Sequence, residues 1–247
     1  MEQTKILKLY KNLGETPLEC IERFRSENSQ YKDMKMTYAG RLDPMAEGLL
    51  LVLAGDTKEK NTYLGLNKTY EFEVLLGVNT DTHDILGIVS DISEEKPKIN
   101  IEDILDKIKD IKIQKYPAFS SRTVLGKPLF AWARQNKLDD LEIPKKEINI
   151  FDIRYLGKKE ISKDKLQDEV IAKIKKVKGD FRQNEIINKW QDALSNSKED
   201  NFEIFSFIAD VSSGTYIRGL AFEMGRLLKI GGIAYSIKRT RVGEFVL

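Results

Sequence analysis

Apolar residues recur along this chain with two different periods, and together they predict an α+β fold. From Lys68 to Leu76, apolar Tyr70, Phe72 and Val74 alternate with polar Thr69, Glu71 and Glu73, as in a half-buried strand. Shorter apolar runs predict further strands at 6–10, 49–53, 85–89, 148–156 and 202–211. The segment 202–211 is apolar on both faces, so we place it in the interior of the sheet.

Helical spacing and start signals predict the remaining elements. Thr16 is a candidate N-cap, Pro17 suits the first helical position, and Glu19 completes a capping box. The residues expected to face the core from this helix are Leu18, Ile21 and Phe24, with Cys20 on the same side. Further helices are predicted at 56–64, 101–108, 128–135 and 216–229, and a loop at 26–38.

Residues 159–200 differ from their surroundings and predict a pair of helices inserted between two strands of the main sheet. One apolar stripe runs through an otherwise charged segment, breaks at Gly179-Asp180, and then resumes. The lysines of this segment could contact a polyanion, but a solvated helix face is the simpler interpretation. We therefore expect residues 1–247 to form one domain that carries a helical insertion.

Composition excludes several classes of protein. Of the 247 residues, 41% are hydrophobic and 32% are charged, which is typical neither of a disordered chain nor of a membrane protein. No apolar run approaches the roughly 20 residues that span a bilayer, and the N-terminus lacks the pattern of a secretion signal. The single cysteine, Cys20, fits a reducing compartment, so we predict a cytoplasmic protein.

The scarcity of histidine narrows the chemistry. His83 is the only one, which argues against Ser-His and Cys-His catalysis and against multi-histidine metal sites. The working groups of an enzyme would then be Asp, Glu, Arg, Lys or Tyr. Net charge is only +2, but from residue 226 onward five basic residues face a single acidic one. Such a strip can follow phosphates, or it can be an ordinary solvated surface.

The segment Gly40 to Gly48, which reads Gly-Arg-Leu-Asp-Pro-Met-Ala-Glu-Gly, places Asp43 in a glycine-bounded turn before an apolar run. A carboxylate there lies close to a packed core and yet remains accessible, which suits a nucleophile. By itself, an Asp-Pro pair between glycines is more often a simple turn. The functional interpretation therefore depends on distant partners.

Four segments in order along the chain resemble TruB-type tRNA pseudouridine synthases. They are the 40–48 segment, Lys68-Thr69-Tyr70, the Gly77 to Gly87 segment with its Thr-Asp-Thr-His-Asp run, and Ser213 to Arg218, which reads Ser-Gly-Thr-Tyr-Ile-Arg. Weaker similarity covers residues 116–135. The resemblance implies a pseudouridine synthase fold: a mixed, largely antiparallel sheet flanked by helices, with a central RNA-binding cleft. Because the chain stops at Leu247, we expect no separate C-terminal PUA-like domain.

The resemblance also implies roles for three residues. Asp43 would be the nucleophile, Tyr70 would stack on a flipped base and assist proton removal, and Arg218 would pair with Asp43. Elementary chemistry agrees, because an aspartate with an ordinary pKa of about 3.9 is already ionised at neutral pH. An arginine keeps it ionised inside a closed pocket, and an aromatic ring suits an unstacked base.

Six further residues are implied to contact the substrate. Tyr38 stands where the family usually has a histidine and could act as an aromatic wedge, and Ile237 takes the place of an apolar residue beside the target base. The six residues are Tyr38, Arg41, Lys68, Ile237, Lys238 and Arg239. The implied reaction converts the T-loop uridine of tRNA (position 55 by convention) to pseudouridine, without cofactor, metal or membrane, and we expect a monomer.

Simpler interpretations exist for each residue. Tyr70 alone could be strand packing, Arg218 could be a surface ion pair in the first turn of a helix, and Asp81, Thr82 and Asp84 are favoured as turn residues rather than catalytic ones. Two alternative functions remain open. One is a pseudouridine synthase with another target such as rRNA, and the other is a non-catalytic RNA-binding or RNA-folding factor.

Overall fold

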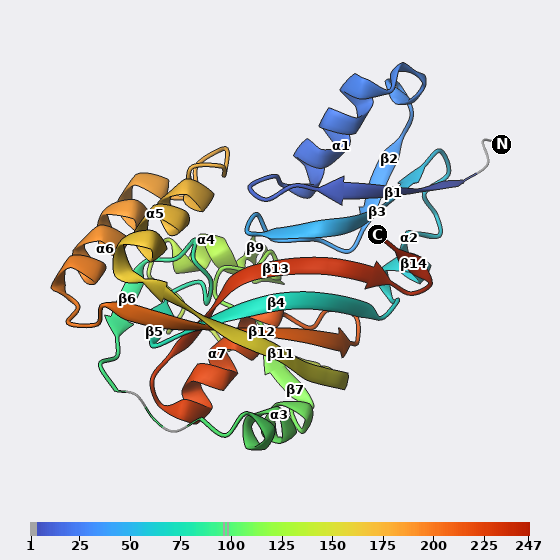
Figure 1. Cartoon of the computed structure of the whole chain (residues 1–247). Helices are drawn as coiled ribbons and strands as arrows, with labels where there is room; N and C mark the ends of the chain where they lie inside the picture. Colours follow the sequence, from blue (N-terminus) through green and yellow to red (C-terminus); the bar gives the residue numbers. More distant parts are fainter. Residues whose placement is uncertain (1–3, 96, 98) are drawn as a thin grey trace.

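A mixed sheet forms the centre of the molecule, with helices packed against it (Figure 1). The structure is a computed structural model, and it describes residues 4–95, 97 and 99–247. Six strands follow one another across the sheet in the order β1-β3-β13-β4-β12-β11, while β2 pairs with β3 and β14 with β13. β3 and β13 run parallel, and the other neighbours are antiparallel. The predicted fold class, an α+β fold with a mixed, largely antiparallel sheet, is confirmed.

The bounds of the elements are as follows. The helices are α1 (Pro17–Glu27), α2 (Lys60–Leu64), α3 (Ile101–Lys109), α4 (Leu129–Ala133), α5 (Lys163–Ile174), α6 (Gln183–Asn196) and α7 (Ile217–Leu228), with the 3₁₀ turn η1 (Ser29–Tyr31). The strands of the main sheet are β1 (Lys5–Lys11), β2 (Met36–Ala39), β3 (Ala46–Ala54), β4 (Lys68–Leu76), β11 (Ile150–Ser162), β12 (Asn201–Val211), β13 (Gly232–Val242) and β14 (Phe245–Val246). Three two-stranded ribbons pair β5 (Val78–Thr80) with β6 (Val89–Ile92), β7 (Ile113–Lys115) with β10 (Lys145–Glu147), and β8 (Thr123–Val124) with β9 (Lys127–Pro128).

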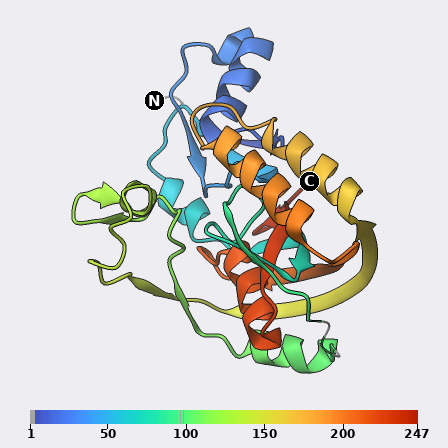
Figure 2. The same ribbon diagram turned by 90° about the vertical axis from the view of Figure 1, so that its left-hand side faces the viewer.

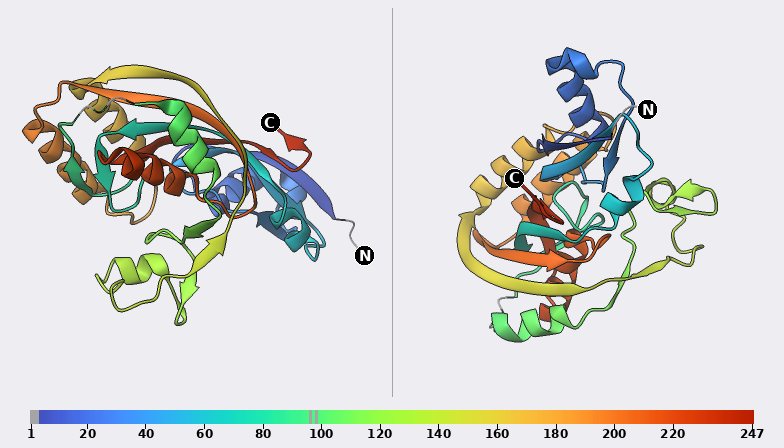
Figure 3. Two further views of the ribbon diagram at one scale, coloured as in Figure 1. Left: turned by 90° about the horizontal axis from the view of Figure 1, so that it is seen from below. Right: turned by 90° about the vertical axis from the view of Figure 1, so that its right-hand side faces the viewer.

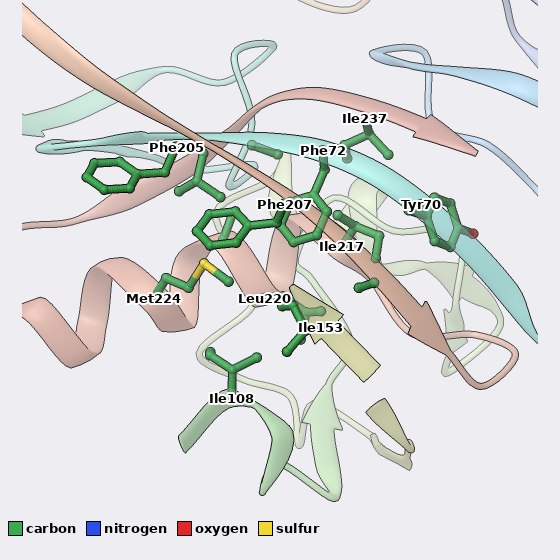
Figure 4. Packing of buried hydrophobic residues seen from close by; sticks show 14 of the residues in the cluster. Tyr70, Phe72, Ile108, Ile153, Phe205, Phe207, Ile217, Leu220, Met224 and Ile237 are labelled. Carbon is green, nitrogen blue, oxygen red and sulfur yellow. The ribbon is translucent and has the colours of Figure 1, made fainter. Parts of the chain in front are cut away.

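Alternation along the strands builds a hydrophobic core on each face of the sheet. Phe72 and Phe207 stack on one face, with ring centroids 5.5 Å apart, where α7 and α3 cover them. Figure 4 shows this cluster, with Tyr70 and Ile237 at one end and Met224 at the other. On the opposite face, Leu75 and Ile204 join the core formed by α5 and α6. The sheet therefore has buried side chains on both faces, as β12 was predicted to have.

The register of the central strands brings distant residues to the same end of the sheet. Ile237 on β13 pairs with Ala46 on β3, and Arg239 pairs with Tyr70 on β4. Asp43 lies in the turn that leads into β3. Segments that are distant in the chain therefore meet at this point, because one parallel and one antiparallel pairing place β13 between β3 and β4.

The helical pair predicted at 159–200 is present as α5 and α6, which lie side by side against one end of the sheet (Figure 2). The buried residues of α5, Leu166, Val170 and Ile174, form the predicted stripe, and Trp190 of α6 is 0% exposed. The indole nitrogen of Trp190 donates a hydrogen bond to the carbonyl of Ile85, 3.2 Å away. The pair therefore shares its core with the β5–β6 ribbon. The strand β11 continues to Ser162, so the helices begin four residues later than predicted.

Several local predictions are confirmed. Thr16 accepts a hydrogen bond from the Glu19 amide and Glu19 reaches back to the Thr16 amide, so the capping box is present with Pro17 in the first turn. Cys20 and Ile21 are buried. Residues 77–92 form a hairpin in which Asp84 and Thr82 bond to one another and to backbone, which is the structural role favoured for them.

Other local predictions are wrong. Leu18 is 61% exposed, because it lies in the first turn of α1 and borders a cavity instead of joining the core. Ile85 is fully buried without being part of a strand, since it packs under α6 rather than along a ladder. The expected loop at 26–38 contains η1 and the strand β2, which pairs with the edge of β3 and shows no alternation of its own. The helix predicted at 56–64 begins only at Lys60.

Residues 113–147, with α4 and the two short ribbons β7–β10 and β8–β9, project from the body of the molecule (Figure 3). Tyr116 and Phe119 lie where this projection joins the sheet domain, beside α7. Among the described residues, no helix is both long and apolar enough to cross a membrane.

Replacing Trp190 by alanine should destabilise the protein by about 3–5 kcal/mol, because it removes a fully buried ring and leaves the Ile85 carbonyl without its donor. Denaturant unfolding monitored by circular dichroism measures the change. Leu156→Ala is the matched control, since Leu156 is 58% exposed and should change stability little. A loss below 1 kcal/mol for Trp190→Ala would show that α6 does not share the core.

Candidate active site

The turn that carries Asp43 is fixed on both sides by the protein core. Leu42 and Met45 are 3% and 4% exposed, and the Ala46 amide donates to the Asp43 carbonyl, 3.0 Å away. Gly48 at the end of the segment has φ +107°, and a Cβ there would lie 2.3 Å from the carbonyl oxygen of Arg239 on the neighbouring strand. Glycine is therefore required at this position, where β3 passes close to β13.

Arg218 lies in the first turn of α7, with its guanidinium in the interior and only 2% of its surface exposed. Its Nε donates to Oδ2 of Asp43 at 2.9 Å, its Nη1 to the Thr82 carbonyl at 2.8 Å, and its Nη2 to the Phe119 carbonyl at 2.9 Å. The simpler interpretation of Arg218 as a surface ion pair is wrong. A buried charge requires partners on all sides, and three separate segments supply them.

The carboxylates around Arg218 set the electrostatics of the site. Burial acts to lower the pKa of Arg218, but the negative charges of Asp43 and Asp84 outweigh burial and raise it. Burial raises the pKa of Asp84 to about 6, although Arg218 and the Thr82 hydroxyl act in the opposite direction. Asp84 Oδ1 accepts hydrogen bonds from Thr82 Oγ1 at 2.6 Å and from the Leu86 amide at 3.0 Å. Arg218 therefore lies in the field of two carboxylates, of which only Asp43 touches it.

Asp43 forms part of the wall of a cavity of about 240 Å³, which we call the Asp43 cavity. Its side chain is 30% exposed, and Arg218 contacts only Oδ2. Within residues 4–95, 97 and 99–247, Oδ1 accepts no hydrogen bond from protein. The carboxylate is therefore held in direction by one oxygen, while the other is open to a ligand.

Tyr70 and Ile237 line the same cavity, on β4 and β13 respectively. Both belong to the core cluster, and they are 7% and 6% exposed. Figure 4 shows the phenol oxygen of Tyr70 directed away from the rest of the cluster. Asp43, Tyr70 and Ile237 therefore line one cavity, as the resemblance implies, and Arg218 reaches it through its contact with Asp43; the cavity combines aromatic and aliphatic walls with one carboxylate.

Lys68 and Arg239, which the resemblance implies to contact the substrate, are buried beside the Asp43 cavity, and their contact with a substrate stays a prediction. Arg239 is 1% exposed and donates to the carbonyls of Leu49, Gly40 and Arg41. These hydrogen bonds hold the backbone on both sides of the Asp43 turn. Lys68 is 3% exposed and donates to the Leu64 carbonyl at 2.7 Å and to Ser213 Oγ at 3.1 Å. Burial, with help from Arg239, lowers the pKa of Lys68 to about 7. Both side chains border the Asp43 cavity but hold backbone rather than face outward.

Tyr38, Arg41 and Lys238 are at least partly exposed. Arg41 donates to the Tyr38 hydroxyl at 2.9 Å, and Lys60 lies 5.5 Å from the centre of the Tyr38 ring. Tyr38 borders a second cavity of about 480 Å³, the adjoining cavity, which shares Asp43 and Arg41 with the first. Lys238 lies beside Glu71 and Glu47 on neighbouring strands, so its charge is partly balanced. Contacts of these residues with a substrate stay predictions.

Reasoning from the sequence missed several parts of the site. Tyr216 and Tyr116 line the Asp43 cavity with their rings 5.9 Å apart, and burial raises the pKa of Tyr216. Tyr216 stands inside the Gly-Thr-Tyr-Ile-Arg segment, so the motif itself was the available signal. The carbonyls of Thr82 and Phe119 carry no such signal, because any residue can supply a backbone acceptor. In the described part of the chain, no group of three or more His, Cys, Asp or Glu residues could hold a metal ion.

Comparison with known proteins finds a matching family model and relatives over most of the chain. Residues 28–181 match the family model described as TruB family pseudouridylate synthase (N terminal domain). The chain is 27% identical over 233 residues to the tRNA pseudouridine synthase B of Aquifex aeolicus, and 30% identical over 244 residues to that of Thermosipho melanesiensis. These alignments cover 94% and 97% of this chain but 66% and 64% of the relatives, slightly less than two thirds of their length. The Staphylococcus aureus protein of the same name is 30% identical over 98% of this chain and 67% of its own.

Solved structures show the same fold. A crystal structure of a Cbf5-Nop10-Gar1 complex matches 98% of this chain and 49% of the other, with a TM-score of 0.56 and 18% sequence identity. A structure of an H/ACA RNP bound to a substrate RNA matches 98% of this chain and 48% of the other, with a TM-score of 0.51 and 16% identity.

The only histidine of the chain should titrate far below the ordinary range. The ring of His83 stacks on Phe222 at 4.1 Å, and burial, followed by the charge of Arg218, lowers its pKa from 6.5 to about 4. Proton NMR should therefore show a single imidazole titration with a midpoint near 4. A midpoint near 6.5 would show that the loop at residues 80–84 is open.

The lowered pKa of His83 also determines how the stability of the folded protein changes with pH. Between pH 6.5 and about 4 the unfolded chain binds a proton at His83 that the folded protein does not, so stability falls as the pH falls through this window. The variant His83→Asn keeps a residue suited to the left-handed backbone at φ +63° and should lose less stability than wild type over that range.

Proposed function

The chain belongs to the TruB family of pseudouridylate synthases, and from that premise we propose that it isomerises a uridine of tRNA to pseudouridine. The activity is named for relatives that are about half as long again as this chain. For this chain it is supported by the geometry of the site. The observation that carries the proposal is the Asp43–Arg218 pair at the wall of the Asp43 cavity, with one carboxylate oxygen that accepts no hydrogen bond from the described residues.

The reaction is an isomerisation, so its atoms balance without a co-reactant. The bond from the sugar to N1 of uracil breaks, a bond from the sugar to C5 forms, C5 loses a proton and N1 gains one. Asp43 is the nucleophile in this proposal, because it is an accessible carboxylate that needs no activating base. Arg218 keeps the carboxylate ionised and fixes its direction through a charge-assisted hydrogen bond.

A uridine must leave its stack to reach Asp43, because the carboxylate lies at the wall of a cavity. Tyr70 offers an aromatic ring for the flipped base and a phenol oxygen for the proton at C5, while Ile237 packs beside the base. Tyr216 and Tyr116 add aromatic walls that match a planar base. Such stacking contacts contribute about 1–3 kcal/mol each.

The RNA element that we propose is the T-arm of tRNA, bound by a monomer in the cytoplasm. Recognition of RNA relies on shape, phosphates and splayed bases. Arg41 and Lys60 gather positive charge around Tyr38 at the border of the adjoining cavity, where a phosphate backbone could lie. Tyr38 is then the proposed wedge that fills the place of the extruded base.

Asp43→Asn should abolish pseudouridine formation and leave RNA binding largely intact, since the amide keeps the size of the side chain and loses its nucleophilic charge. Unmodified tRNA is incubated with pure protein, pseudouridine is mapped, and affinity is measured by filter binding. The matched control Asp192→Asn removes an exposed carboxylate on α6 and should behave as wild type. Wild-type product from Asp43→Asn would refute the role of Asp43, and modification of rRNA but not tRNA would replace the proposed substrate.

Two substitutions at Tyr70 separate stacking from proton transfer. Tyr70→Phe keeps the ring and should bind RNA normally but turn over far more slowly, because the phenol oxygen is lost. Tyr70→Leu should weaken RNA binding as well, by roughly 1–3 kcal/mol. Single-turnover rates and dissociation constants are compared for the two variants. Full turnover by Tyr70→Phe would restrict Tyr70 to stacking.

A further inference from the structure

The turn between α5 and α6 reaches from the helical pair to the candidate active site. Arg182 precedes α6 with a left-handed backbone, φ +63°, and its side chain is 20% exposed. Its Nη1 lies 2.9 Å from Oδ2 of Asp81, and the centre of its guanidinium lies 4.4 Å from the centre of the Phe119 ring. Arg182 therefore contacts the 80–84 loop and the projecting 113–147 segment at the same time.

These two segments are the ones that hold the guanidinium of Arg218. Thr82, next to Asp81, accepts from Nη1 of Arg218, and Phe119 itself accepts from Nη2. One half-buried arginine, Arg182, thus bridges the two stretches of backbone whose carbonyls orient the fully buried Arg218. Asp81 Oδ1 also accepts from the Ile88 amide at 2.8 Å, so the Asp81 carboxylate links Arg182 to the base of the β5–β6 ribbon.

The turn that carries Arg182 is itself fixed. The Gln183 side chain donates to the carbonyls of Val177 and Gly179 at 2.9 and 2.8 Å, and accepts from the Phe181 amide at 2.9 Å. Arg134 of the projecting segment binds the Asp180 carboxylate at 3.2 Å. Behind the turn, Trp190 anchors α6 to Ile85. The helical pair is therefore attached to residues 81–85 at two places, to Ile85 through Trp190 and to Asp81 through Arg182.

We propose that Arg182 is a positioning residue, which braces the Thr82 and Phe119 segments so that Arg218 holds Asp43 in its reactive direction. The catalytic consequence of this inference rests on the proposed function. In this proposal, the helical pair α5–α6 carries the residue that orients the active site. An arginine suits the task, because its planar guanidinium stacks on an aromatic ring while it pairs with a carboxylate. A lysine can supply the charge but not the planar stacking.

Kinetics distinguish bracing from a direct contact with RNA. Arg182→Gln should lower the single-turnover rate by about 10- to 100-fold, the size of effect expected when reacting groups shift by roughly 1 Å. The RNA dissociation constant should change by less than about threefold, because the interaction acts on the chemical step. Arg182→Lys should recover part of the rate. The control Lys189→Gln removes an exposed positive charge from the same helix and should leave the rate unchanged.

A double variant tests the path of the interaction. Asp81→Asn should lower the rate comparably, and the Arg182→Gln, Asp81→Asn pair should lose little more than either change alone. Additive losses would overturn bracing through Asp81. Weaker RNA binding with an unchanged rate would assign Arg182 to phosphate contact instead, and a lower melting temperature with an unchanged rate would assign it to stability alone.

The imidazole signal of His83 supplies a readout that needs no RNA. His83 follows Thr82, and it is the only histidine, so its NMR signal reports on the braced loop. The signal should shift in Arg182→Gln and remain in place in Lys189→Gln. An unchanged signal in Arg182→Gln would refute the bracing role. If wild type modified no RNA, the proposed function would fail, and this measurement would still decide the bracing role.

Discussion

A fully buried guanidinium is the constraint on which the rest of the site depends. Arg218 cannot stay charged in the interior unless each face of its guanidinium meets an acceptor, and the acceptors come from Asp43, Thr82 and Phe119. Those residues belong to three segments that are distant in sequence, and the guanidinium contacts all three at once. Loss of the Asp43 carboxylate would leave the buried charge without the carboxylate that contacts it, which is far more costly than the loss of a surface ion pair. Because Arg218 is buried, its ion pair with Asp43 fixes the direction of the Asp43 carboxylate.

The sheet positions the walls of the Asp43 cavity, and the loops position the acceptors around Arg218. The rigid strands β3, β4 and β13 bring Ala46, Tyr70 and Ile237 to one end through their register, so the walls of the Asp43 cavity need no loop to form. Arg239 then ties the Asp43 turn to β13 by hydrogen bonds to three backbone carbonyls. The loops contribute the carbonyls that face Arg218, and these loops depend on side chains outside the sheet. Precision at Asp43 thus comes from the strands on one side and from braced loops on the other.

Much of the fold and the centre of the site could be predicted from the sequence, for identifiable reasons. Alternation gave β4 with its bounds, capping signals gave the start of α1, and the four-segment resemblance placed Asp43, Tyr70 and Arg218 together. Residue type does not reveal burial. The resemblance implies that Arg239 and Lys68 contact the substrate, and it gave no sign that both are buried beside the Asp43 cavity with hydrogen bonds to backbone carbonyls. Leu18 was expected in the core because it shares helical spacing with Ile21 and Phe24, yet its side chain is 61% exposed. Backbone acceptors such as Phe119 left no trace in the sequence at all.

Positive charge near Asp43 is abundant, and the way it is distributed explains how the carboxylate stays usable. Lys68, Arg239 and Arg218 all border or approach the site, but the first two direct their donors to backbone. Among the residues that the structure describes, only Arg218 donates a hydrogen bond to the Asp43 carboxylate, and only at Oδ2. If the neighbouring cations also bound the carboxylate, both oxygens would be occupied and the group would be a structural ion pair. Because the buried Lys68 has a pKa lowered to about 7, it is also only partly charged near neutral pH. The site therefore keeps one strong partner that orients Asp43, and one free oxygen that can meet a substrate.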